Sequence, residues 1–79
     1  MDADRARITW ACRRGMLELD LMLEGFMERG YDALPEAERP VFERLLKTGD
    51  QQLLAWLMGH EQSDEKEFIH VIKAIRSST

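Results

Sequence analysis

The spacing of the apolar residues is the feature that most constrains the fold of this 79-residue chain. Apolar residues recur three and four positions apart in five blocks, which is the pattern of helices that bury one face. No segment alternates apolar and polar residues over the length of a strand. The sequence therefore predicts an all-α fold, a compact bundle of five short helices that forms a single domain over residues 1–79.

The predicted helices cover about residues 4–13, 16–29, 35–47 and 51–58, and the last begins near residue 63. Pro40 lies inside the third of these segments, where a proline removes a hydrogen bond and clashes with the preceding turn. We therefore expect a kink there, or a helix that begins near Arg39.

Several residues near the helix ends carry capping signals. Gly30 is expected to end the second helix in a left-handed conformation, and Gly59 to end the fourth. Asp50 is expected to cap the fourth helix by accepting backbone N–H bonds. Asp64 and Glu65 are expected at the start of the last helix, where its dipole favours negative charge.

The two tryptophans are predicted to have different surroundings. Trp56 lies three positions after Leu53 on an apolar stripe and is assigned to the core. Trp10 points away from the narrow apolar stripe of the first helix. Leu17 and Leu21 lie off the main stripe of the second helix. We expect a neighbouring helix to cover them, and if exposed they would extend an interface.

Composition and charge exclude several classes of protein. The net charge of −4 argues against nucleic acid as the main partner, because phosphate binding needs clustered Lys and Arg. The single cysteine forms no internal disulfide and suits a reducing compartment. No apolar run approaches the roughly 18 residues of a membrane span, and no signal peptide is recognisable. We expect a cytoplasmic monomer that does not insert into a membrane.

No catalytic or metal-binding pattern is present in the sequence. His60 and His70 have no ligand partner nearby, and one cysteine does not supply a structural zinc site. Cys12 fits a small residue that faces the core. There is no glycine-rich phosphate loop or dinucleotide fingerprint. These observations predict no metal site, no catalytic residue and a protein that is not an enzyme.

The stretch RGMLELD, residues 14–20, has two interpretations. In one, Arg14 and Glu18 form a surface ion pair worth only about 0.3–0.5 kcal/mol, and Gly15 breaks the helix. In the other, the stretch is an interface: Gly15 lets a partner's backbone approach, and Arg14 offers a planar fork of donors. Trp10 would then be an aromatic anchor. Composition alone favours the first interpretation.

RGMLELD also resembles the RGxxE signature of the SdhE (YgfY) family, the flavinylation factors of succinate dehydrogenase. Further similar segments stand at family-like intervals, and the resemblance covers nearly the whole chain. Thr9, Pro35 and Pro40 depart from the usual pattern of the family. The similar segments are WACR at residues 10–13, YDAL at 31–34, F-x-x-L-L at 42–46 and D-x-x-L-x-x-W-L-M at 50–58.

The resemblance implies a five-helix assembly chaperone that binds the flavoprotein subunit of succinate dehydrogenase, or the related subunit of fumarate reductase. It implies that the factor promotes covalent attachment of FAD to a histidine of that client, while binding no FAD stably itself. The residues that match the signature, with their neighbours, are the predicted partner-binding set: Arg14, Gly15, Glu18, Trp10, Met16, Asp20 and Arg7.

Two other functions compete with this one. The family has also been described as an antitoxin, which would antagonise a small membrane-bound toxin. A flavin-binding enzyme is the third class, and it predicts a yellow purified protein, whereas we expect a colourless one.

Overall fold

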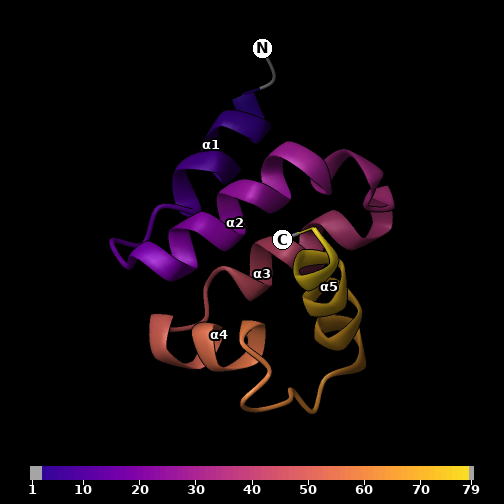
Figure 1. Cartoon of the computed structure of the whole chain (residues 1–79). Coiled ribbons are helices and arrows are strands. Elements are labelled where there is room, and N and C mark those ends of the chain that lie inside the picture. The colour runs from indigo at the N-terminus through magenta and orange to yellow at the C-terminus, as the bar shows by residue number, and fades with distance from the viewer. Residues whose placement is uncertain (1–2, 79) are drawn as a thin grey trace.

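The computed structural model describes residues 3–78 of the chain, apart from the side chain of Asp4, and contains no strand among them. Five α-helices and two short 3-10 helices follow one another along the chain, which confirms the predicted all-α bundle (Figure 1). The helices are α1 (Ala3–Ala11), α2 (Leu17–Arg29), η1 (Tyr31–Ala33), η2 (Glu36–Glu38), α3 (Arg39–Leu45), α4 (Asp50–Leu57) and α5 (Lys66–Ser77).

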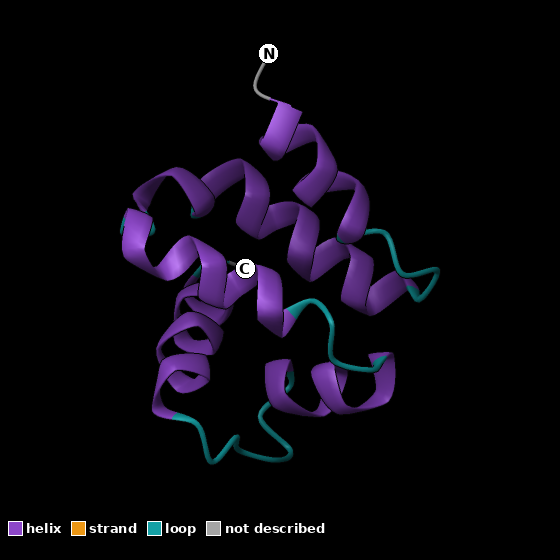
Figure 2. Cartoon of the chain, turned by 180° about the vertical axis from the view of Figure 1, so that it is seen from behind, coloured by secondary structure: helices purple, strands orange, loops and turns teal. Residues whose placement is uncertain are grey.

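The five α-helices surround one core. Helices α1 and α2 lie side by side at one end of the molecule and α4 lies at the other, with α3 and α5 between them (Figures 1 and 2). Three aromatic rings occupy the middle of the core. The Phe26 and Phe42 centroids are 5.0 Å apart, and the Tyr31 ring lies 5.8 Å from that of Phe42. The apolar stripes of the sequence therefore meet in one cluster, to which every α-helix contributes.

Pro40 lies in the first turn of α3, which begins at Arg39. Residues 36–38 form the separate 3-10 helix η2, so the long third helix does not form and the alternative start near Arg39 is confirmed. A proline is tolerated in a first turn because an N–H there has no partner within the helix.

Gly30 stands at the C-cap of α2 as predicted, but the left-handed conformation expected there is wrong. Gly59 follows the end of α4 as expected. Gly59 has a φ of +80°, in the left-handed region. Gly30 has a φ of −124°. A β-carbon at Gly30 would collide with the ring of Phe26 and the hydroxyl of Ser78. Close packing, not a left-handed turn, accounts for a glycine at position 30.

The last helix begins at Lys66 rather than near residue 63, so that prediction is also wrong. The Ser63 side chain is buried, and its hydroxyl accepts the backbone N–H of Glu65 at 3.1 Å. This local bond stabilises a turn in place of a first helical turn. Asp64 and Glu65 therefore precede α5.

Candidate functional site

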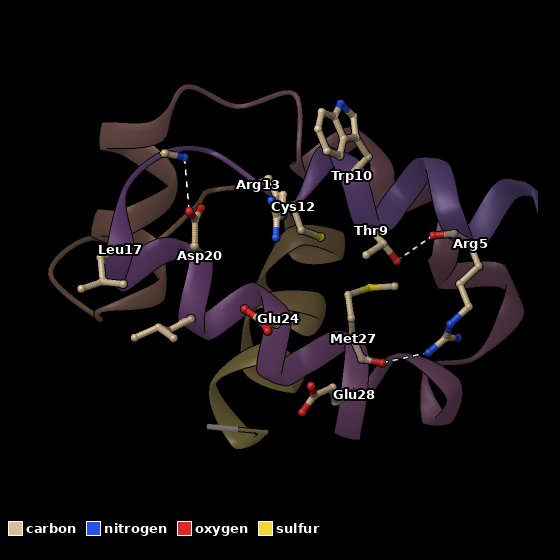
Figure 3. Close-up of a pocket in the computed structure, with 12 residues that line it drawn as sticks. Arg5, Thr9, Trp10, Cys12, Arg13, Leu17, Asp20, Glu24, Met27 and Glu28 are labelled. Atoms are coloured by element: carbon tan, nitrogen blue, oxygen red, sulfur yellow. Dashed lines mark hydrogen bonds between the residues drawn. The ribbon is translucent and has the colours of Figure 1, made fainter.

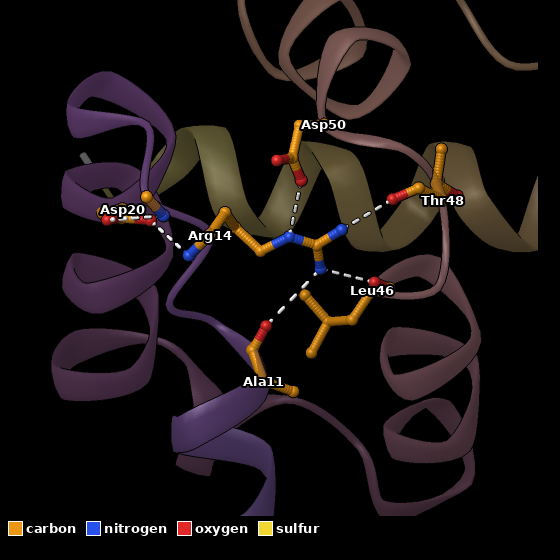
Figure 4. Close-up of polar contacts among 7 residues, drawn as sticks. Ala11, Arg14, Asp20, Leu46, Thr48 and Asp50 are labelled. Atoms are coloured by element: carbon orange, nitrogen blue, oxygen red, sulfur yellow. Dashed lines mark hydrogen bonds and ion pairs between the residues drawn. The ribbon is translucent and has the colours of Figure 1, made fainter.

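The side chain of Arg14 is held inside the molecule (Figure 4). Its Nε lies 2.8 Å from Oδ1 of Asp50. The two terminal nitrogens donate to three backbone carbonyls, those of Leu46 at 2.5 Å, Thr48 at 2.7 Å and Ala11 at 3.4 Å. Only 14% of the side chain is exposed. Arg14 thus ties the turn between α1 and α2 to the turn between α3 and α4.

This geometry corrects the expected cap at Asp50 and excludes the ion pair between Arg14 and Glu18 that one interpretation of RGMLELD assumed. Asp50 is the first residue of α4 and makes no capping hydrogen bond, because its carboxylate faces Arg14. Gly49 stands at the N-cap position instead. Arg14 pairs with Asp50 and not with Glu18, because Arg14 precedes α2 and does not share a helix with that glutamate. Glu18 is exposed in the first turn of α2.

The Asp20 carboxylate also holds the turn between α1 and α2 in place. Its Oδ1 accepts the backbone N–H of Arg14 at 2.7 Å, and its Oδ2 accepts that of Gly15 at 3.3 Å. The carboxylate comes from the first turn of α2, where the helix dipole also favours negative charge. Met16, the N-cap residue, is half-buried against the core. Asp20 and Met16 therefore shape the turn that presents Gly15.

Gly15 itself is exposed and has a φ of +81°, which L-amino acids with a side chain rarely adopt. A β-carbon built there meets no other atom within 4 Å. The predicted turn at Gly15 is confirmed, and within residues 3–78 nothing covers it.

A groove of about 830 Å³ runs between α1 and α2 beside this turn (Figure 3). Its floor includes the buried side chains of Cys12 and Met27. The exposed fractions of Trp10, Leu17 and Leu21 are 73%, 73% and 59%. These three large side chains line a surface that is open to solvent.

The exposure of Trp10 was predicted, but the expected burial of Leu17 and Leu21 is wrong. The first helix and the residue that follows it bury only two apolar side chains, Ile8 and Cys12. Such a narrow stripe covers one side of α2 and leaves the two leucines exposed.

The Cys12 thiol lies beneath the groove and is not arranged as a nucleophile. Burial raises its pKa to about 11, partly opposed by the nearby Arg14 guanidinium. The thiol is therefore protonated near neutral pH, whereas a reactive cysteine needs a lowered pKa. Its predicted place in the core is confirmed.

The remaining candidates lie apart from the groove. Arg7 forms an ion pair with Glu43 of α3, with 2.6 Å between Nη2 and Oε1. His60 and His70 are both exposed. Across residues 3–78, no three His, Cys, Asp or Glu side chains gather as a metal site would require. In the same range, no helix combines the length and apolar character of a membrane span.

Sequence reasoning missed the contact between Arg14 and Asp50, which are 36 positions apart. The spacing of 4, 3 and 4 positions does place Leu17 and Leu21 on one side of the second helix with Glu24 and Glu28. It did not predict that this row lines a groove beside α1.

The sequence and the fold of this chain both match described proteins. Residues 6–79 match the family model described as the flavinator of succinate dehydrogenase. The chain belongs to this family.

Individual relatives are similar over nearly the whole chain. The FAD assembly factor SdhE of Idiomarina loihiensis is 45% identical over 74 residues, which are 94% of this chain and 82% of that protein. The protein of the same name from Legionella pneumophila is 46% identical, over 94% of this chain and 92% of its own. The solution structure of a UPF0350 protein superposes with a TM-score of 0.78 at 41% identity, covering 98% of this chain and 83% of that one.

Proposed function

We propose that this protein is an FAD assembly factor that binds the flavoprotein subunit of succinate dehydrogenase and promotes covalent attachment of FAD to it. The observation that carries this proposal is the family match over residues 6–79. The similar proteins of Idiomarina and Legionella bear the name FAD assembly factor. Their names favour this function over the antitoxin alternative.

The client docks, in this proposal, on the surface formed by Trp10, Gly15, Leu17, Glu18 and Leu21, here called the docking surface. Its support is exposure: each of these residues is accessible, and three are large and apolar. Soluble proteins seldom expose adjoining large apolar side chains without a partner for them. An exposed tryptophan is also the type of residue that dominates binding energy at interfaces.

The other members of the predicted set act from behind this surface. Arg14 and Asp20 hold the backbone of the turn through the hydrogen bonds described above. Met16 packs against the core. Arg7 lies on α1 and pairs with Glu43, so it orients α1 against α3. These four residues position the docking surface. The client mainly contacts the exposed residues of that surface and not these four.

The mechanism is selection of a client conformation. The factor binds best to the state in which the client's acceptor histidine and the isoalloxazine ring of FAD lie close together. Only this difference in affinity between states shifts the client towards attachment. The covalent chemistry belongs to the client. The chain itself acts in the cytoplasm as a monomer, is not an enzyme and holds no FAD stably. It binds the flavoprotein subunit of fumarate reductase through the same surface.

Flavin fluorescence of the client in denaturing gels tests this function. Cells that lack the native factor are complemented with the wild type, with Gly15→Ala or with Gly15→Arg. Both variants carry the same backbone strain, but only arginine projects bulk from the docking surface. We expect fluorescence to be retained largely by the alanine variant and lost in the arginine variant. A folded Gly15→Arg protein that supports full attachment would show that the docking surface is misplaced.

Co-purification separates the competing functions. A tagged wild-type chain should retain a dehydrogenase flavoprotein, whereas an antitoxin would retain a small membrane protein. The purified chain should be colourless, and stoichiometric FAD on it would favour the flavin-binding enzyme.

A further inference from the structure

The outer row of α2 changes its chemical character along its length. Leu17, Leu21, Glu24 and Glu28 are spaced by 4, 3 and 4 positions and therefore form one ridge of the helix. All four line the groove and are exposed. The ridge is apolar beside the Gly15 turn and acidic farther from it (Figure 3).

The acidic part of the ridge is not neutralised by the facing helix. Arg5 reaches this region from α1, where its Nη2 donates to the carbonyl of Met27 at 2.9 Å. Its charge is already paired with Asp32. Glu28 has only a neighbouring arginine at 3.7 Å, and Glu24 has no ion pair among residues 3–78. Arg13 also lines the groove, but no ion pair of the described residues joins it to Glu24 or Glu28. Two carboxylates thus face the groove without an ion pair from α1 or from the turn after it.

Resting on the proposed function, we propose that this groove binds an amphipathic helical segment of the flavoprotein subunit. The segment places apolar side chains against Leu17 and Leu21. One to two turns farther along, it places lysine or arginine against Glu24 and Glu28. From Leu17 to Glu28 the ridge is roughly 16 Å long at 1.5 Å per residue, so the occupant is a helix of about three turns. A helix in a groove is a common mode of peptide recognition, read through anchors at such spacings.

The two halves of the ridge have different roles in this complex. Burial of the leucines supplies affinity, because apolar surface leaves water. The glutamates fix the direction in which the segment lies and speed its approach, as complementary charges do at interfaces. Reversing the glutamates should therefore weaken binding most at low salt, where charges are least screened.

The first test compares two double variants of equal charge change. Glu24→Lys with Glu28→Lys reverses the acidic half of the ridge. Glu36→Lys with Asp64→Lys is the matched control, since both residues are exposed and lie outside the groove. The probe is the purified, FAD-loaded flavoprotein subunit, and binding is measured by calorimetry at low and high salt.

We expect the groove variant to bind at least about tenfold more weakly at low salt, with a smaller loss at high salt. The control should bind within about twofold of the wild type. Equal losses for the two variants would overturn the proposal, because a general charge effect would then explain them.

Zero-length carbodiimide cross-linking identifies the occupant. Glu24 and Glu28 should be joined to lysines on one helical segment of the flavoprotein, located by mass spectrometry. Cross-links from these two glutamates to a second copy of this chain would overturn the proposal, as would cross-links only from Glu36 and Asp64.

Failure of this inference can be told from failure of the proposed function. If Gly15→Arg abolishes binding while the groove variant binds normally, the assembly function stands and the inference about the acidic half is wrong. If the wild type itself does not bind the flavoprotein, the proposed function fails and the inference falls with it.

Discussion

Two turns of this molecule share a backbone conformation but differ in their surroundings. Gly15 and Gly59 have φ values of +81° and +80°, and each follows a helix that carries a tryptophan. A β-carbon at Gly15 would face open space, whereas one at Gly59 would meet the guanidinium of Arg76. Both glycines are exposed, but only Gly59 has a side chain from a distant part of the described chain beside it.

The two turns are also held differently. At Gly59 the helix closes its own end: the N–H of His60 donates to the carbonyl of Ala55, and that of Gly59 to the carbonyl of Trp56. These two bonds form a Schellman motif. At Gly15 the turn is held by side chains, Asp20 from α2 and Arg14 through its distant partners. The turn at Gly15 therefore depends on tertiary contacts. These contacts hold its backbone in place although no other part of the described chain covers it.

The tryptophans follow the same division. Trp56 is half-buried, and its ring lies 5.9 Å from that of Phe68. Trp10 stands exposed at the groove. A tryptophan before a left-handed glycine therefore has no fixed role in this molecule. The neighbouring helices decide whether it packs against the core or is left exposed.

The largest effect should come from alanine at the tryptophans. Trp56→Ala should lower the free energy of unfolding by about 3 kcal/mol, because it removes a large ring packed against the core. Trp10→Ala should change it by less than about 0.5 kcal/mol. Chemical denaturation measures both. Affinity for the flavoprotein should show the reverse order, with a loss of at least about tenfold for Trp10→Ala. Similar stability losses for the two variants would break the comparison.

Arg14→Ala should lower the free energy of unfolding by about 2 kcal/mol, because several hydrogen bonds from a charged group are lost together. The adjacent Arg13 is the matched control, since it is exposed and forms no ion pair within the described chain. Arg13→Ala should cost less than about 0.5 kcal/mol in the same denaturation experiment. Equal costs would mean that the contacts of Arg14 contribute nothing to stability.

Alanine at each left-handed glycine should cost about 1 kcal/mol, because both backbones are strained for residues with a β-carbon. Gly59→Ala should cost slightly more than Gly15→Ala, since the Arg76 side chain must also move. Thermal unfolding measures this cost, and Gly59→Ala should leave flavoprotein binding unchanged. Weakened binding by Gly59→Ala would show that the docking surface extends to the turn at Gly59.

The smallest effect is a loss of stability at high pH that comes from the Cys12 thiol beneath the groove. This loss is absent at neutral pH. An unperturbed thiol has a pKa of 9.0, and burial raises that of Cys12 to about 11. Between these values the unfolded chain binds fewer protons, so stability falls as the pH rises. The contribution of the protonated thiol to the free energy of unfolding is fully present below pH 9 and is lost as the pH rises towards 11. The expected loss is about 1 kcal/mol near pH 10.

Denaturation of the wild type and of Cys12→Ala over this pH range tests the effect. The difference in unfolding free energy between the two proteins should shrink as the pH rises. A constant difference would show that the thiol titrates alike in the folded and unfolded chains.

The sequence by itself determined the number and order of the α-helices, most of the core and the exposure of Trp10. These depend on contacts between residues three or four positions apart, and helical periodicity records such contacts directly. The end of α4 at Gly59 was predictable for the same reason, since its hydrogen bonds are local. The signature RGMLELD also indicated the family to which the chain belongs.

Only the tertiary structure decided what the residues of that signature do. The partners of Arg14 at positions 46–50 lie more than 30 positions away, and no local pattern links them to it. The same contact turned Asp50 from an expected cap into a partner for arginine. The exposure of Leu17 and Leu21 depended on how little of α2 the narrow stripe of α1 covers. Periodicity states which face of a helix is apolar, but the packing of other helices decides which apolar face is covered.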